Sequence, residues 1–473
     1  MYSKEMIKRI SIIVLFCSLS YYTYSQSKNH IRNVDYMHYI FNEDISYERS
    51  LSYSNLIFQP RIFAAKNIFS NNDLLYYGVH IKTTTNNKIN FYFSYDIAEK
   101  NDLIHIINIK DSLAIIPSFG LEKNRLTYNL EWNINKIFTT QLGLGNQFIG
   151  EGYHSLFLSS KNSPYNFLKI KTDLGRIKYN NLYSEIFDAR NIFDLKKKFL
   201  AIHYLSFKFN KFFDFGVFES VVWQADNLSY NRGFDISYLN PIIFYRPVEF
   251  SKNSPDNVMM GLASNIHIKN FHIYNQLLID DLNISRQKDA DSEYEGGFFQ
   301  NKFAYQIGIK KNNKKNNILL EYNHIQPYTY AHKEPMQSYT HLNQSLAHPF
   351  GANLKEFVFL FRYKFKEPYL DFKLTSTRIG LDSADTHYGQ NIFLSDFLAQ
   401  GDNSLYSYGN YNGQGVFTTV NTLNIEFVYP IKYFDFFINS YYYYQSSDIK
   451  TSEFPYLFIG IRNFPLSTFS LTN

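Results

Sequence analysis

The chain has 473 residues, of which 19% are charged and 45% hydrophobic, and its formal net charge is +5. A charge so close to neutral for this length gives no reason to expect a nucleic-acid partner. Cys17 is the only cysteine, so disulfides and cysteine-ligated metals are excluded if the N-terminal segment is removed. The 45 Phe and 41 Tyr fit either the aromatic girdles of a membrane barrel or a codon bias.

The first 25 residues are typical of a secretory signal. They begin with basic residues, continue with a short apolar run over 11–19, and offer a cleavage point after Ser25. The apolar run is shorter than the roughly 20 residues that a membrane-spanning helix needs. Phe16 stands where a lipoprotein signal has a small residue before its cysteine. We therefore predict a cleaved signal peptide over 1–25 and no lipid attachment.

Residues 26–70 lack strand periodicity and are predicted to form a small N-terminal periplasmic or helical segment. Val34, Met37, His38 and Phe41 have helical spacing, and Asn33 could cap the helix. The segment is too short to be the plug domain of a TonB-dependent importer. The remaining residues, 71–473, are assigned to one further domain.

Strict alternation of apolar and polar residues recurs along that domain. Leu126 to Ile134, Phe357 to Phe365 and Leu423 to Tyr429 are examples, and a period of two indicates strands. About 18 such segments lie between Leu74 and Phe464, each near the roughly 9–11 residues that a tilted strand needs to cross a membrane. Short turns alternate with longer loops, including 285–300, 326–353 and 382–414. We predict an all-β fold: a transmembrane outer-membrane β-barrel of about 18 antiparallel strands with a small N-terminal helical element. A soluble sandwich is the alternative.

Four stretches resemble the Wzi-like capsule assembly family, and in particular its gliding-motility RemB branch. They are 145–188, which begins with the glycine-broken loop GNQFIGEGYH, then RGFDISYLNPIIFYRPVEFSKNSPD over 232–256, YTHLNQSLAHPFGANLKE over 339–356, and YGQNIFLSD over 388–396. The resemblance implies an 18-stranded barrel and a role at the cell surface. That role would be support of gliding motility, or attachment and assembly of surface polysaccharide.

Six residues are candidate contacts for polysaccharide or for the barrel lumen. Five are charged and lie within the family motifs: Glu151, Arg232, Arg246, Glu249 and Asp256. A guanidinium can bind a carboxylate through two parallel hydrogen bonds, so the arginines are candidates for an acidic sugar. The competing interpretation is a set of ion pairs filling the barrel interior. Tyr408 represents the loop tyrosines, which either stack on sugars or pack at an interface.

An acidic run and a group of four histidines are predicted to have no role in binding a metal or in catalysis. The acidic run from Asp280 to Glu295 lacks the glycine turn of a calcium loop and is predicted to be a solvated loop. The histidines 324, 332, 341 and 348 have gaps that match no known zinc spacing, so no metal site is predicted. The paired carboxylates Asp280 and Asp281 could suit a glycosidase, but nothing else in the sequence indicates an enzyme or a cofactor.

The predicted function is therefore that of a non-enzymatic outer-membrane barrel. Its expected partners are outer-membrane lipid and either surface polysaccharide or surface motility proteins. The alternative is an outer-membrane pore for small solutes.

Overall fold

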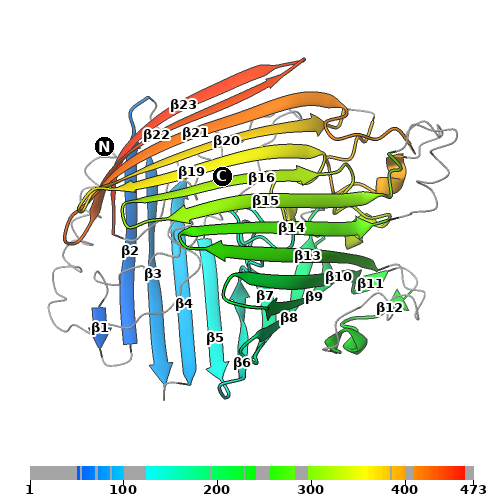
Figure 1. The fold of residues 1–473 in the computed structure, drawn as a ribbon, viewed down its shortest axis with the longest axis horizontal. Helices are drawn as coiled ribbons and strands as arrows, with labels where there is room; N and C mark the ends of the chain where they lie inside the picture. Colours follow the sequence, from blue (N-terminus) through cyan, green and yellow to red (C-terminus); the bar gives the residue numbers. More distant parts are fainter. Residues whose placement is uncertain are drawn as a thin grey trace.

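The computed structural model describes residues 51–53, 56–69, 73–85, 88–100, 124–191, 194–227, 230–240, 256–282, 297–383, 386–399 and 408–463. Nearly all of these residues lie in strands or in the connections between strands (Figure 1). Within this part of the chain, no helix combines the length and the apolar character that crossing a membrane would take.

Eighteen antiparallel strands follow one another around a closed barrel. Each is hydrogen-bonded to the next barrel strand along the chain, as expected for an up-and-down barrel in which no strand edge faces lipid. The first nine are β2 (Leu56–Asn67), β3 (Leu74–Thr85), β4 (Ile89–Lys100), β5 (Asn124–Asn133), β6 (Phe138–Gly145), β7 (Tyr165–Asp173), β8 (Ile177–Asp188), β9 (Lys196–Lys208) and β10 (Phe213–Gln224). The others are β13 (Asn257–Ile268), β14 (Phe271–Asp281), β15 (Lys302–Asn312), β16 (Asn316–Ile325), β19 (Leu354–Lys364), β20 (Tyr369–Leu381), β21 (Val416–Pro430), β22 (Asp435–Ser447) and β23 (Thr451–Arg462).

The barrel closes where β23 pairs with β2. The paired residues run from Phe63 opposite Arg462 to Asn67 opposite Phe458, and the start of β2 pairs instead with the short strand β1 (Leu51–Tyr53). On the inner side of this seam, the rings of Phe63 and Phe437 stack with centroids 5.1 Å apart. Phe458 joins the same buried cluster. Aromatic packing therefore supports the shortest strand pairing in the barrel wall.

The two faces of each strand differ in the way that a lipid-embedded barrel requires. Along β21, Thr418, Thr422, Asn424 and Glu426 are buried, whereas the intervening Phe417, Leu423, Ile425 and Tyr429 are exposed or half-buried. β19 alternates in the same manner, with Glu356 and Arg362 buried and Phe357 exposed. The apolar side chains point outward to the position of the acyl chains, and the polar side chains point into the lumen.

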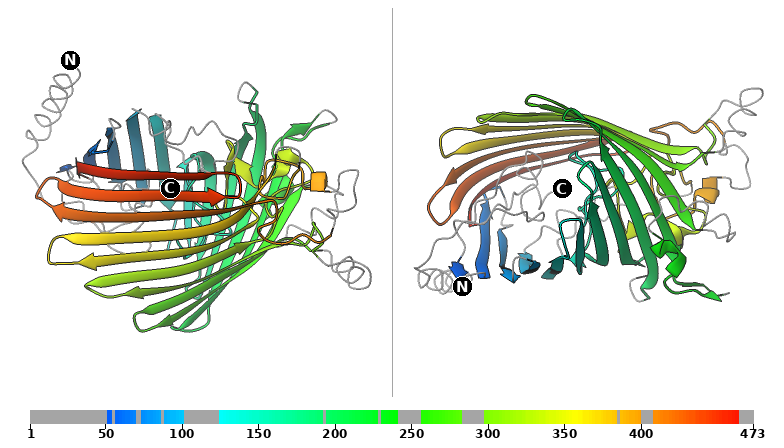
Figure 2. Two further views of the ribbon diagram at one scale, coloured as in Figure 1. Left: turned by 90° about the horizontal axis from the view of Figure 1, so that it is seen from above. Right: turned by 60° about the horizontal axis from the view of Figure 1, so that its bottom comes forward.

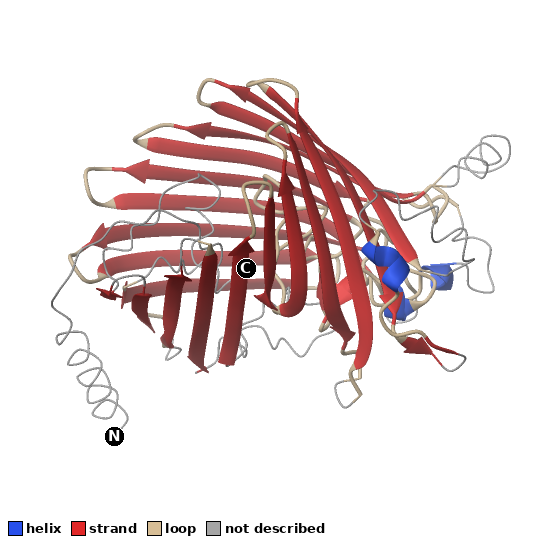
Figure 3. Ribbon diagram, turned by 90° about the horizontal axis from the view of Figure 1, so that it is seen from below, coloured by secondary structure: helices blue, strands red, loops and turns tan. Residues whose placement is uncertain are grey.

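The two ends of the barrel have different connections. At one end the strands are joined by turns of two to four residues, such as the turn between β13 and β14. At the other end most connections are long, and they carry β11 (Asp226–Asn227), β12 (Tyr230–Asn231), β17 (Thr340–His341), β18 (Gln344–Ser345), η1 (Ile236–Leu239), η2 (Pro335–Gln337) and η3 (Asp396–Ala399). Figure 3 shows these short helices gathered at one end of the barrel. In outer-membrane barrels the short turns lie on the periplasmic side and the long loops on the extracellular side.

The predicted fold class is confirmed as an antiparallel barrel with 18 strands. The barrel begins earlier than predicted, because β2 starts at Leu56 whereas the sequence analysis put residues up to 70 in the N-terminal segment. Gln59, Arg61, Phe63 and Ala65 of β2 are buried at alternate positions, a pattern partly hidden by its apolar outer neighbours. The predicted signal peptide and the helix over 33–41 lie outside the described residues.

Phe359 lies midway along β19 on the outward face and provides a test of this orientation. We expect Phe359→Arg to destabilise the barrel in lipid vesicles by about 2–4 kcal/mol relative to Phe359→Leu, because the charge would lie near the bilayer midplane. Urea titration of the vesicle-embedded variants measures this difference. Equal stability of the two variants would contradict an outward, lipid-facing position.

Candidate functional site in the barrel lumen

Two long connections fold against the inner wall of the barrel. We call residues 146–164, between β6 and β7, the first inward loop, and residues 326–353, between β16 and β19, the second inward loop. Figure 2 shows loop segments lying between the opposing walls of the sheet. Both loops bond to inward-facing side chains of β14, β15, β16 and β19, so they occupy the lumen on that side.

Glu321 of β16 is the main anchor of the first inward loop. Its carboxylate accepts hydrogen bonds from the backbone N–H groups of Tyr153 at 2.7 Å and His154 at 3.0 Å. The hydroxyl of Tyr274 and the amide of Asn323 donate to the same carboxylate. A buried carboxylate requires several donors to offset its lost hydration, and Glu321 has four. The wall thereby provides the partners that the loop backbone lacks outside a sheet.

Gly152 permits this close approach. A Cβ atom added at Gly152 would lie 2.1 Å from a carboxylate oxygen of Glu321 and 2.8 Å from the carbonyl oxygen of His154. Any larger residue would displace either the loop or its anchor. The glycine-broken segment that stands out in the sequence is therefore required by contact with the wall.

Two glutamines extend the anchoring along the wall. Gln276 of β14 accepts a hydrogen bond from the backbone N–H of Leu156 at 2.8 Å. Gln306 of β15 donates to the carbonyl oxygen of His154 at 3.0 Å. Inward polar residues on three adjacent strands thus bind one loop through its backbone. These bonds do not depend on the loop's side chains, so the anchoring restricts residue type mainly at the tight contact of Gly152.

The second inward loop packs on the first. The hydroxyl of Tyr330 donates to the carbonyl oxygen of Leu156 at 3.0 Å, and that of Tyr339 donates to the carbonyl oxygen of Phe157 at 2.8 Å. Tyr330 has a φ of 73°, in the left-handed region, and its backbone N–H donates to Asp280 at 2.8 Å. Its strained backbone is therefore fixed by bonds at both ends of the residue.

Buried lysines hold the second inward loop against the wall. Lys302 of β15 donates to the carbonyl oxygen of Ala331 at 3.0 Å and to Asp396 at 3.0 Å, and Asp280 lies 3.5 Å away. Lys198 of β9 donates to the carbonyl oxygen of Ser338 at 2.9 Å. Removing either cation would leave buried acceptors without a donor, which is costly.

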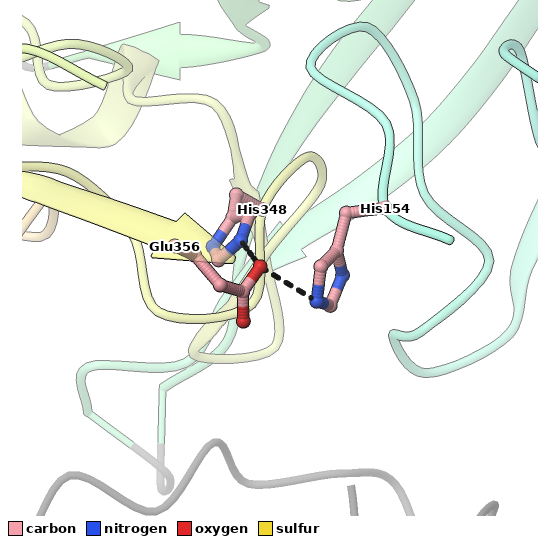
Figure 4. A group of neighbouring side chains, drawn as sticks. All are labelled: His154, His348 and Glu356. Carbon is pink, nitrogen blue, oxygen red and sulfur yellow. Dashed lines mark hydrogen bonds and ion pairs between the residues drawn. The ribbon is translucent and has the colours of Figure 1, made fainter. Parts of the chain in front are cut away.

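Where the two loops meet the wall, two imidazoles converge on one carboxylate (Figure 4). Nε2 of His154 lies 3.2 Å and Nε2 of His348 2.9 Å from the same oxygen of Glu356. Burial lowers the pKa of His154 well below its usual range despite the opposing effect of Glu356, so this imidazole is neutral at pH 7. Burial also lowers the pKa of Lys161 to about 7, although Glu356 and Glu321 oppose that shift. The ammonium of Lys161 lies 3.6 Å from the ring centre of Tyr153.

The opposite side of the lumen is different because its polar side chains remain accessible. Glu131 of β5 accepts from Asn90 of β4 at 3.0 Å and lies 3.8 Å from Lys171 of β7. The side chain of Lys171 is 38% exposed and that of Glu131 is 19% exposed, compared with 1% for Glu356. These residues face away from the apolar outer residues of β5, so the accessible surface that they contribute is lumenal. The inner wall is therefore accessible to solvent at Glu131 and Lys171 and dry beneath the loops.

The predicted contact residues do not form one cluster among the described residues. Arg232 donates to both oxygens of Asp256 at 2.8 Å and to Asp235 at 2.7 Å, within the connection between β10 and β13. Glu151 lies in the first inward loop with an exposed side chain. Tyr408 packs against Phe298, with ring centroids 5.2 Å apart. Arg246 and Glu249 lie outside the described residues. A role for any of these six in binding stays a prediction.

Other candidates can be placed more fully. Asp280 and Asp281 contact Lys302, while the rest of the predicted acidic loop lies outside the described residues. Tyr328 and Tyr330 are buried, with their hydroxyl groups bonded to backbone carbonyls. Of the four histidines considered together, only His348 joins a cluster, and its partners His154 and Glu356 were not among the candidates. Spacing along the chain could not reveal this group, because it joins two loops and a strand.

A comparison with protein-family models found no match, and a comparison with curated proteins found none either. Among solved structures, the chain is similar to OprD of Pseudomonas aeruginosa, with a TM-score of 0.47 and 10% identity over 88% of this chain and 97% of that one. It is also similar to the outer membrane protein OpdK of the same organism, with a TM-score of 0.45 and 7% identity over 86% and 97%. OccAB2 of Acinetobacter baumannii gives a TM-score of 0.46 and 10% identity over 86% and 97%.

The resemblance to the Wzi-like capsule assembly family and its RemB branch was wrong. No family model matches the chain, and the solved structures named above are of the OprD and Occ type. The role in gliding motility or in attachment and assembly of surface polysaccharide rested on that resemblance and is withdrawn with it. An outer-membrane location is retained.

Replacing the anchor tests whether the wall holds the first inward loop. We expect Glu321→Leu to leave the N–H groups of Tyr153 and His154 without an acceptor, at a cost of about 1–3 kcal/mol each. Amide hydrogen exchange of residues 150–158 should accelerate strongly, whereas Glu321→Gln, which keeps an acceptor, should have a smaller effect. Unchanged exchange in Glu321→Leu would show that the loop is held by other contacts.

Proposed function

We propose that the protein is an outer-membrane pore for small polar solutes, whose lumen is narrowed by two inward loops. The observation that carries this proposal is the accessible polar surface that Glu131 of β5 and Lys171 of β7 present inside a closed barrel. Lys171 and Glu131 are 38% and 19% exposed, compared with 1% for Glu356, so this part of the inner wall is within reach of water. Barrels with 16–18 strands are wide enough to leave an aqueous channel.

The loops narrow this lumen. The first inward loop is bonded to β14, β15 and β16, and the second is bonded to the first. The wall of β4–β7 faces them with both signs of charge and with amides, so a path there would favour polar over apolar solutes. The proposed role is passive and requires no catalytic residue or cofactor.

Electrical recording from the purified barrel in a planar bilayer tests the proposal. We expect stepwise single-channel currents from the full chain. Replacing residues 150–160 by a short Gly-Ser linker should raise the unit conductance severalfold, because the first inward loop narrows the lumen. Folding is verified by heat-modifiable electrophoresis and by the β-sheet circular dichroism signal. A folded barrel that stays silent with and without the loop would refute the pore function.

Ion selectivity offers a second test that leaves the loops intact. Lys171→Glu reverses a charge on the accessible inner wall, so the reversal potential in a salt gradient should shift toward cation preference. The matched control is Lys314→Glu, which reverses an exposed charge at the tip of the turn between β15 and β16. Equal shifts in the two variants, or none in either, would place the conducting path away from β7.

A further inference from the structure

The cluster of His154, His348 and Glu356 has the composition of a metal site. One carboxylate oxygen and two imidazole nitrogens lie within 4.8 Å of one another, and all three residues are buried. The imidazoles come from the two inward loops and the carboxylate from β19, as Figure 4 shows. Two histidines and one glutamate form a common ligand set for Zn²⁺ that leaves a fourth position open.

Two of the three separations within the cluster are close to those around a bound metal. Zinc bonds of about 2.0–2.1 Å place tetrahedral ligand atoms about 3.3 Å apart. The two nitrogen-to-oxygen distances are 3.2 Å and 2.9 Å. The third separation, between the two nitrogens, is at most 4.8 Å, so all three atoms lie within reach of one cation.

The remaining bonds of Glu356 already orient it. Asn323 of β16 donates to its shared oxygen at 3.1 Å, and the hydroxyl of Thr377 on β20 donates to its other oxygen at 3.2 Å. A ligand carboxylate is normally held by such outer hydrogen bonds. Because the strand wall fixes the carboxylate, the loops supply the two ligands that can move.

Metal binding would use Nε2 of both imidazoles, which leaves Nδ1 as the nitrogen that can carry a hydrogen. A hydrogen that Nε2 donates to Glu356 is therefore given up when the metal binds. For His348 this costs the contact between Nδ1 and the N–H of Phe350, which at 3.4 Å is long. Nδ1 of His154 is buried and makes no hydrogen bond within the described part of the chain.

The geometry points to an exchangeable site for a divalent transition metal, with Zn²⁺ as its best fit, formed by His154, His348 and Glu356. Losing outer partners weakens metal sites by about 10–100-fold, and the missing partner of His154 makes this site weaker than a structural zinc centre. Bound metal would tie both inward loops to β19.

Metal titration of the chelator-stripped full chain in detergent tests this site. We expect calorimetry to show one equivalent of Zn²⁺ bound, and Co²⁺ to give the visible absorption of a four-coordinate site with nitrogen and oxygen ligands. His348→Gln and Glu356→Gln should each abolish stoichiometric binding. The matched control, His332→Gln, alters a histidine of the same loop that lies outside the cluster and should bind as the unaltered chain does.

Zn²⁺ should also slow hydrogen exchange in both inward loops of the unaltered chain and have no such effect in Glu356→Gln. Absence of stoichiometric Zn²⁺ binding by the folded, unaltered chain would overturn the inference. So would full binding by both ligand variants, because the metal would then lie elsewhere. None of these measurements depends on conductance, so a failure to bind Zn²⁺ would leave the proposed pore function untouched. Conversely, a barrel that binds Zn²⁺ but conducts no current would support the metal site and refute the pore.

Discussion

The lipid outside the barrel leaves the charged side chains of the spanning strands only one place to lie, the lumen. A charge on the outer face near the midplane costs about 2–4 kcal/mol, so alternation along each strand sends polar residues inward. Once inside, charges out of reach of water must be paired. Arg362 forms two 2.6 Å hydrogen bonds with Asp371, and Arg462 donates to Glu426 at 2.9 Å. The interior chemistry of this protein follows from that requirement.

The inward loops meet the same requirement from the other side. A loop in the lumen has backbone groups without sheet partners, and the inward strand residues have side chains without water. Glu321 and Gln276 satisfy both needs at once, because they bond to the N–H groups of the first inward loop. At the short-turn end of the barrel, ion pairs between strands take this place. Buried inward side chains are thus satisfied by two different means, whereas Glu131 and Lys171 remain accessible to solvent.

Much of the fold could be predicted from the sequence, because a period of two is a local signal that survives in each strand. β5 and β19 follow the predicted alternation closely. β2 was missed because the neighbouring residues Ile62 and Phe63, which point to opposite faces of the strand, are both apolar and both buried at the seam. The alternation of polar and apolar residues is therefore interrupted there. The family resemblance failed for a related reason. Its motifs lie largely in connections, where Gly, Asn and aromatic residues also serve turns and loop packing.

The candidate site could not be predicted in the same way. That the loops turn inward depends on the fit of Gly152 against Glu321, two residues 169 positions apart in the sequence. The His154–His348–Glu356 cluster likewise needs three segments in place before any spacing is meaningful. The glycine-rich loop and the histidines could be recognised in the sequence, but the strand residues that they contact, Glu321 and Glu356, could not. What the sequence did carry was the amide and carboxylate content of the inward faces of β14–β16.

The anchoring bonds also bear on how a solute would pass. Four hydrogen bonds join the wall to the backbone between residues 153 and 156, through Glu321, Gln276 and Gln306. At about 1 kcal/mol each, and more for those to a charged group, displacing the loop as a unit would cost several kcal/mol. A path along the accessible wall of β4–β7 needs no such displacement. Passage beside fixed loops is therefore favoured over a gate that opens by moving them, and a metal joining the loops to β19 would strengthen that preference.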